Sequence, residues 1–114
     1  MRPELDAMRP PSPDDLGRAP LWQNYAIAQA VQASRAQIPE HTLAFGIEVD
    51  GLRLRLRFQL SEATEEDVLD ISDIAGDLEA LVGPDAEVES VYEVRDQRQI
   101  SAHDGVCWIF LSRA

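Results

Sequence analysis

Two runs of alternating apolar and polar residues, joined by a short turn sequence, give the clearest structural signal in the chain. Their apolar positions are Leu43, Phe45, Ile47, Val49, Leu52, Leu54, Leu56, Phe58 and Leu60. An alternation with a period of two is typical of strands that bury one face. Asp50 and Gly51 lie between the runs and suit a type I′ turn, in which both central residues need positive φ. The pattern predicts a β-hairpin whose two-residue loop pairs Val49 with Leu52 and puts every apolar residue on one face.

Two further segments have the periodicity of helices. From Leu21 to Ile38 apolar residues recur at helical spacings among Ala and Gln, and Pro39 disfavours helical geometry at the residue before it. The alanines of this segment would let the helix lie close to a sheet. The second segment runs from Ser61 to Val82, and Thr64 followed by three acids is typical of a capped helix start. We expect its inward stripe to be Val68, Ile71, Ala75, Leu78 and Val82.

Two shorter runs complete the predicted elements. Residues 86–95 alternate between largely apolar and largely acidic positions, and residues 106–111 are apolar on both faces, as expected of a well-covered strand. A polar loop at residues 96–105 separates them. We therefore predict an α+β fold in the order helix-strand-strand-helix-strand-strand, with one mainly antiparallel four-stranded sheet and two helices packed on one face.

The first twenty residues differ in composition from the rest. Residues 1–20 hold five of the seven prolines and few large apolar groups, which is typical of a solvated arm. Residues 21–114 suffice for a single domain with a modest core. The apolar runs are too short to cross a bilayer, and none follows the N-terminal arginines as in a secretory signal. We expect a cytoplasmic protein with a Pro-rich arm and a single α+β domain.

The charge of the chain is strongly one-sided. The net charge is −11, and all ten basic residues are arginines. Nucleic acids and anionic membranes bind basic surfaces, so we expect neither as a partner. Acidic surfaces attract basic proteins. The composition therefore favours a basic protein partner.

Acidic residues concentrate in the second half of the chain. From Ser61 to Val94 there are twelve acids and no base. An exposed helix normally mixes acids with bases, because like charges four residues apart destabilise it. Four acids follow at steps of four, three and four on the outer side of the second helix: Glu66, Asp70, Asp73 and Asp77. A solvated helix face is one interpretation of this row, but the missing bases favour the prediction that it binds a protein partner.

Three arginines alternate along the outer face of the predicted hairpin, at Arg53, Arg55 and Arg57. A phosphate site is one interpretation, but alternation alone predicts polar residues on the solvated side of a one-sided sheet. The acids of the third strand complement these arginines, namely Glu87, Glu89 and Glu93. Because opposite charges on neighbouring strands attract, we expect the second and third strands to be neighbours.

The chain lacks the patterns that catalysis or metal binding requires. Cys107 is the only cysteine, and its apolar neighbours predict a buried position. His41 and His103 have no zinc-motif spacing, and without lysine there is no phosphate-binding loop. The acidic row lies along a helix, whereas a calcium site needs a loop with a central Gly. We expect no catalytic residue, no cofactor and no metal site.

Three parts of the chain resemble a known group of bacterial proteins. They are the run from Leu21 to Ala30 followed by Ile38-Pro39, the acidic helix start at residues 65–67 after a strand ending in Phe-x-Leu, and the closing strand at residues 108–111. In these parts the chain is similar to small acidic immunity proteins found beside polymorphic or contact-dependent toxins, and the resemblance covers residues 21–113. It implies a cytoplasmic protein that binds a toxin domain and blocks it.

Charge supports the same role on physical grounds. Many toxin domains that act on nucleic acids are basic, and an acidic inhibitor is steered onto them electrostatically. Two other functions stay open on the sequence: an acidic secretion chaperone or adaptor, and a structural subunit of a homo-oligomer. Rescue of growth from a toxin separates the first function from the second, and a stable multimer without another partner indicates the third.

Overall fold

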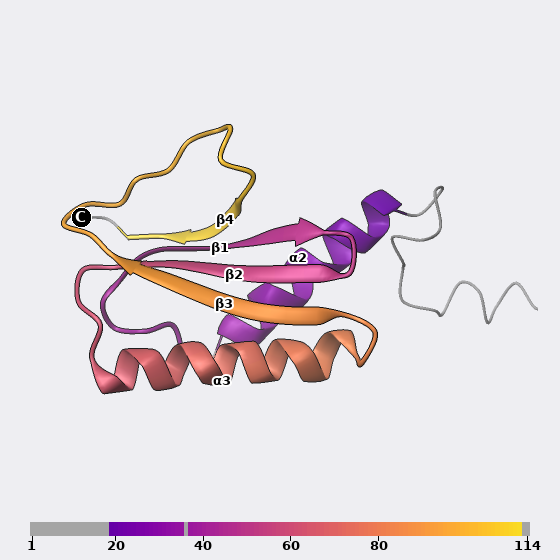
Figure 1. Cartoon of the computed structure of the whole chain (residues 1–114), viewed down its shortest axis with the longest axis horizontal. Helices are drawn as coiled ribbons and strands as arrows, with labels where there is room; N and C mark the ends of the chain where they lie inside the picture. The colour runs from indigo at the N-terminus through magenta and orange to yellow at the C-terminus, as the bar shows by residue number, and fades with distance from the viewer. Residues whose placement is uncertain (1–18, 36, 113–114) are drawn as a thin grey trace, which may run out of the picture.

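The computed structural model describes residues 19–35 and 37–112. The predicted Pro-rich arm lies outside the described residues, except for its last two positions, which begin the first helix. The elements are α2 (Ala19–Ser34), β1 (Thr42–Asp50), β2 (Arg53–Leu60), α3 (Glu65–Val82), β3 (Glu87–Val94) and β4 (Cys107–Leu111). One four-stranded sheet and two helices make up the described fold, which confirms the α+β class (Figure 1).

The sheet is mixed, so the prediction of a mainly antiparallel sheet was wrong. The strand order is β3-β2-β1-β4; β1 is antiparallel to β2 and β4, whereas β2 and β3 are parallel. The connection from β2 to β3 passes through α3, and a crossover of this kind returns the chain to the end of the sheet where it started. The neighbouring position of the second and third strands, predicted from their charges, is confirmed.

The hairpin is present, but its turn lies one residue later than predicted. Gly51 and Leu52 form the two-residue loop, and Val49 pairs with Leu54 rather than with Leu52. Gly51 has a φ of 59°, and no described residue other than glycine has positive φ. A type I′ turn needs positive φ at two residues, whereas a type II′ turn needs it only at the first central residue, where Gly is favoured. The changed register shifts the pairing by two residues and so keeps the apolar residues on one face.

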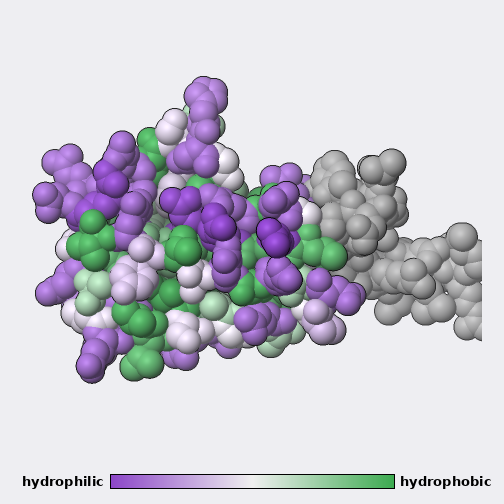
Figure 2. Space-filling model, in the orientation of Figure 1, coloured by the Kyte–Doolittle hydropathy of each residue, from purple (hydrophilic) through white to green (hydrophobic). Residues whose placement is uncertain are grey.

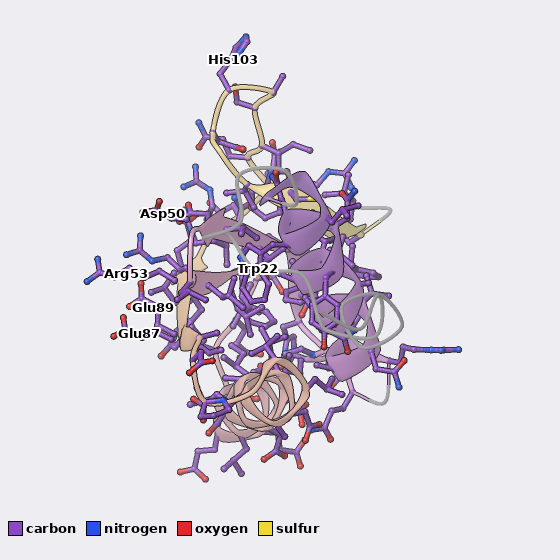
Figure 3. The ribbon with its side chains drawn as sticks, turned by 90° about the vertical axis from the view of Figure 1, so that its right-hand side faces the viewer. Trp22, Asp50, Arg53, Glu87, Glu89 and His103 are labelled. Carbon is purple, nitrogen blue, oxygen red and sulfur yellow. The ribbon has the colours of Figure 1, made fainter. Side chains whose placement is uncertain are left out.

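The apolar face of the hairpin forms the centre of the core. Phe45 and Phe58 stack across the two strands with ring centroids 4.7 Å apart. Leu54 is fully buried beside them, which confirms the predicted inward face. Trp22 of α2 lies between the helix and the sheet, and its Nε1 donates a hydrogen bond to the Gly51 carbonyl at 2.6 Å (Figure 3). This bond ties α2 to the hairpin turn.

Helix α2 is shorter than predicted and faces the sheet with small residues. It ends at Ser34 rather than at Ile38, and the buried Pro39 lies in the non-helical segment that leads to β1. Its buried apolar positions are Trp22, Ala26, Ala30 and Ala33. These spacings put them on one side of the helix, where three alanines allow a close approach to the core.

Helix α3 is rotated relative to the predicted stripe. Its buried positions are Asp67, Ile71, Ile74 and Leu78. Val68, which the prediction placed inside, is 40% exposed. Ile71 and Leu78 are buried as predicted. The other two buried positions are one residue earlier than the predicted Val68 and Ala75, so the buried side of the helix begins with the carboxylate of Asp67.

The loop between β3 and β4 folds back onto the sheet. The buried Gln59 side chain accepts a hydrogen bond from the Gln99 backbone N–H at 2.7 Å and donates one to the Gln99 carbonyl at 2.6 Å. β4 is an edge strand with partly exposed side chains, not the well-covered strand that was predicted. Cys107 at its start is exposed, so its predicted burial was also wrong. An edge strand has a neighbour on one side only, and this leaves its first residue accessible.

Gly46 lies where β1 and the start of β4 approach closely. A Cβ at this position would lie 2.6 Å from the Cys107 carbonyl oxygen and 2.6 Å from Cγ1 of Val106. We expect Gly46→Ala to lower the free energy of unfolding by about 1–3 kcal/mol in urea denaturation, because the backbone must move to admit the methyl group.

Gly76 in α3 provides the matched control. Apart from its chain neighbours and the adjacent backbone of its own helix, no described atom lies within 4 Å of the Cβ position of Gly76. The same change there should raise the free energy of unfolding by about 0.5–1 kcal/mol, because Ala is the better helix former. Equal stability of G46A and the wild type would contradict the close approach of the two strands.

Candidate partner-binding surface

Helix α3 carries the predicted site, and its first turn sets its position. The hydroxyl of Thr64 accepts a hydrogen bond from the Asp67 backbone N–H at 3.1 Å, and the carboxylate of Asp67 accepts one from the Thr64 backbone N–H at 2.9 Å. This reciprocal pair is the capping box indicated by the sequence, with Asp where Glu or Gln is more common. Glu65 and Glu66 lie in the same turn, where the helix dipole favours negative charge.

Asp67 also joins α3 to the start of β1. The side chain of Asp67 is 1% exposed, and its Oδ2 lies 2.7 Å from Nδ1 of His41. Burial would raise the pKa of Asp67, but hydrogen bonds from Thr64 and His41 outweigh burial and lower that pKa to about 2. The same bond to Asp67, helped by the charges of nearby carboxylates, raises the pKa of His41 above its ordinary value of 6.5.

The predicted row of carboxylates lies on the flank of α3 that faces α2. Gln37, which follows α2, donates a hydrogen bond from Nε2 to Oδ2 of Asp73 at 3.1 Å. Tyr25 of α2 donates one from its hydroxyl to the Leu81 carbonyl at 3.3 Å. Helical spacing puts the rest of the row on this flank. Three members are exposed and one is half-buried: Glu66, Asp73 and Asp77 in the first class, Asp70 in the second.

The carboxylates of the sheet, in contrast, are matched by arginines. Arg53 lies 3.4 Å from Glu87 and Arg55 lies 2.5 Å from Glu89, each measured from guanidinium Nε to a carboxylate oxygen. Figure 3 shows Arg53, Glu87 and Glu89 on the side of the sheet turned away from both helices. Exposed pairs of this kind add little to stability, because water screens both charges. Each acidic position of β3 has one arginine beside it, although its carboxylate stays partly exposed.

Seven of the twelve acids between residues 61 and 94 form no salt bridge with another described residue. Glu62 and Asp67 contact His41, and the three glutamates of β3 contact arginines. The seven are Glu65, Glu66, Asp70, Asp73, Asp77, Glu79 and Asp85. Six of them belong to α3 and include all four members of the predicted row. The uncompensated negative charge of this part of the chain is therefore concentrated on one helix.

Both ring nitrogens of His41 contact carboxylates: Nδ1 lies 2.7 Å from Asp67, and Nε2 lies 3.2 Å from Glu62. His103 lies at the tip of the β3–β4 loop and points away from the molecule (Figure 3). Within residues 19–35 and 37–112, no three His, Cys, Asp or Glu side chains are grouped to hold a metal ion. Neither described helix has the length and apolar character of a membrane span.

Two features near the site were not predicted. The burial of Asp67 has a signal in the sequence, because its spacing from Ile71 and Ile74 puts it on the apolar side of α3. The second feature is a group of exposed apolar side chains around α3 and β3: Val68, Tyr92 and Val94. Hydrophobic groups reach the surface over the first half of α3 (Figure 2). Their exposure depends on β3 being an edge strand, which the local pattern does not specify.

We expect the contact between His41 and Asp67 to make stability depend on pH. Because the pKa of His41 is raised on folding, its contribution is complete below about pH 6.5 and is lost as the pH rises through the raised value. The pKa of Asp67 falls from 3.8 to about 2, so its contribution is present above pH 3.8 and is lost as the pH falls toward 2. The contact should stabilise the fold most between about pH 4 and about pH 6.5.

Urea unfolding of the wild type and His41→Asn at about pH 5.5 and about pH 9 measures this effect. Asn keeps a donor for Asp67 but does not titrate. The free energy of unfolding of the wild type should therefore exceed that of H41N by more at the lower pH than at the higher pH. His103→Asn, at the exposed loop tip, is the matched control and should differ from the wild type equally at both pH values. A difference between H41N and the wild type that stays constant with pH would contradict the expected coupling.

The chain matches no protein-family model and has no significant similarity to a curated protein. Functional conclusions therefore depend on the surface itself.

Proposed function

We propose that this protein is a non-catalytic binding protein that uses the acidic flank of α3 to bind a basic protein partner, and that the partner is a toxin domain blocked by the contact. The acidic flank consists of Glu66, Asp70, Asp73 and Asp77. One observation carries the proposal: among the described residues, no cation forms a salt bridge with any of these four carboxylates.

A basic partner would relieve a repulsion that the free protein retains. Acids four residues apart on a helix destabilise it by about 0.2–0.5 kcal/mol per pair. A partner with Lys or Arg at the contact would place positive charges beside the acidic flank, so binding would offset this repulsion with attraction. Clustered negative charge also accelerates the encounter with a positively charged protein.

The charges of the acidic flank also explain how binding could inhibit a toxin. A toxin that acts on nucleic acid needs basic residues where it holds phosphates. A row of carboxylates along a helix complements such residues, so inhibitor and substrate would compete for one surface. This form of inhibition needs no catalytic group on the inhibitor, in agreement with the contacts that occupy both nitrogens of His41.

The double variant Asp70→Asn/Asp73→Asn tests the acidic flank. Asn keeps the size of the side chain and an oxygen that can accept the hydrogen bond from Gln37. We expect the variant to fold at least as stably as the wild type, because repulsion within α3 falls. Its association with the cognate partner should be slower and less dependent on salt, as measured by surface plasmon resonance at about 50 and about 300 mM NaCl.

Asp85→Asn/Asp96→Asn is the matched control, since it also removes two exposed charges but leaves the acidic flank intact. The control should keep most of the rate and salt dependence of the wild type. Unchanged kinetics in Asp70→Asn/Asp73→Asn would show that the partner binds elsewhere, with the arginine–glutamate face of the sheet or the loop at residues 96–105 as the alternatives.

Growth assays separate toxin inhibition from the other binding functions. Co-expression with the partner should rescue cells if the partner is a toxin, and the acidic-flank variant should rescue them less well than the control. A partner that is bound but harmless would indicate a secretion chaperone or adaptor. A stable homo-oligomer that binds no other protein would indicate a structural subunit.

A further inference from the structure

Strand β3 presents a long, regular edge to solvent. It pairs with β2 over eight consecutive positions without a bulge, and β2 is its only neighbour among the described strands. The other edge strand, β4, has five residues and an irregular pairing with β1. Short or bulged edges resist the addition of another strand, whereas long regular edges favour it. β3 is thus the better acceptor of the two.

The backbone groups that face outward on β3 follow from its hydrogen bonds. The Glu87 N–H donates to the Leu52 carbonyl at 2.8 Å, and the Arg95 N–H donates to the Leu60 carbonyl at 2.8 Å. In a parallel ladder alternate residues direct both backbone groups to the same neighbour. The odd-numbered residues of β3 therefore face β2. Those that face the open edge are Val88, Ser90, Tyr92 and Val94.

The surroundings of this edge provide contacts for both faces of an added strand. On the helix side, Tyr92 is 46% exposed and Val94 is 56% exposed. Toward the other end of β3, a hollow of about 1160 Å³ is bordered by Gly76 and Ala80 of α3, which leave room for side chains. On the opposite side, the three glutamates of β3 each pair with an arginine, and their side chains keep 43–76% of their surface exposed beside the edge, where a further cation can reach them.

We infer that the β3 edge binds an extended segment of the partner by strand addition, and that this segment alternates basic with apolar residues. Its basic side chains would lie next to Glu87, Glu89 and Glu93, and its apolar side chains next to Tyr92 and Val94. The inference rests on the proposed function for the basic character of the partner. It adds a second surface, on the flank of α3 opposite to the acidic flank.

Charge argues against a second copy of this chain as the occupant. In a two-fold antiparallel pairing centred on Val91, Glu89 of each copy lies opposite Glu93 of the other. When the pairing is centred on Ser90, Glu87 lies opposite Glu93. Like charges directly opposite each other destabilise a pair of strands, and each copy carries a net charge of −11. A basic strand instead places cations opposite these glutamates, beside the arginines that already contact them.

Ser90→Pro tests the edge without disturbing the sheet. The Ser90 N–H faces outward, so proline removes a group needed by an added strand while leaving every bond to β2 in place. The probe is a blocked peptide of four lysine–valine repeats, titrated by calorimetry and by backbone amide NMR. We expect S90P to bind it at least about tenfold more weakly than the wild type. Ser90→Ala keeps the N–H and should bind within about twofold of the wild type.

Specific outcomes would overturn the inference. The first is that the peptide does not bind the wild type, and the second is that S90P binds it as tightly as the wild type does. The third is that the wild type binds a peptide with its lysines and valines in separate blocks equally well. The fourth is that sedimentation equilibrium shows a homodimer of the wild type that S90P dissociates. If S90P unfolds, protection of the Tyr92 and Val94 amides from exchange by the peptide decides the question in the wild type.

Asp70→Asn/Asp73→Asn separates this inference from the proposed function. Because the acidic flank lies on the other side of α3, this variant should bind the peptide within about twofold of the wild type. Peptide binding that needs the β3 edge would stand even if the acidic flank proved irrelevant to the cognate partner. Peptide binding that is lost in the acidic-flank variant but kept in S90P would overturn the inference and leave the proposed function intact.

Discussion

Strand β2 must bury one set of side chains while keeping another in water, and the rest of the structure depends on how it does so. Leu54, Leu56 and Phe58 are at most 1% exposed, whereas the arginines between them cannot be buried without partners. Both helices therefore pack on a single side of the sheet. The other side stays solvated except where the β3–β4 loop bonds to Gln59. Strands on either side of β2 supply the carboxylates that its guanidinium groups require.

This arrangement also determines where the charge of the molecule remains unbalanced. The arginines of β2 pair with Glu48 of β1 and with two glutamates of β3, and no base lies in the last turn of α3. In its first turn the helix dipole stabilises acids, and the buried carboxylate of Asp67 is held by Thr64 and His41. Toward its C-terminus Asp77 and Glu79 meet the negative end of the dipole instead. The start of α3 is thus anchored by its contacts, whereas the acids in the second half of the helix repel one another.

The sequence was informative where one physical rule governs several neighbouring residues. Alternation predicted the inward face of the hairpin, and the acids after Thr64 predicted the helix start. The position of the turn was harder to predict, because both Asp50-Gly51 and Gly51-Leu52 place a glycine at a position of positive φ. The parallel pairing of β3 could have been derived, since a helix joins it to a neighbouring strand. Which of the two neighbours Asp67 and Val68 is buried depends on the rotation of α3 about its axis, and tertiary packing sets that rotation.

An acidic surface alone gives attraction without much selectivity, since any basic protein satisfies it. Screening limits the range of exposed charges to about 8 Å at physiological salt, so the charges on α3 steer a partner only over the last part of its approach. The proposed backbone pairing at β3 would add a requirement of a different kind, because it admits only an extended segment in one register. The glutamates that favour a basic strand at this edge also disfavour the pairing of two copies. In the proposed complex, attraction of the partner and exclusion of a second copy would therefore come from the same side chains.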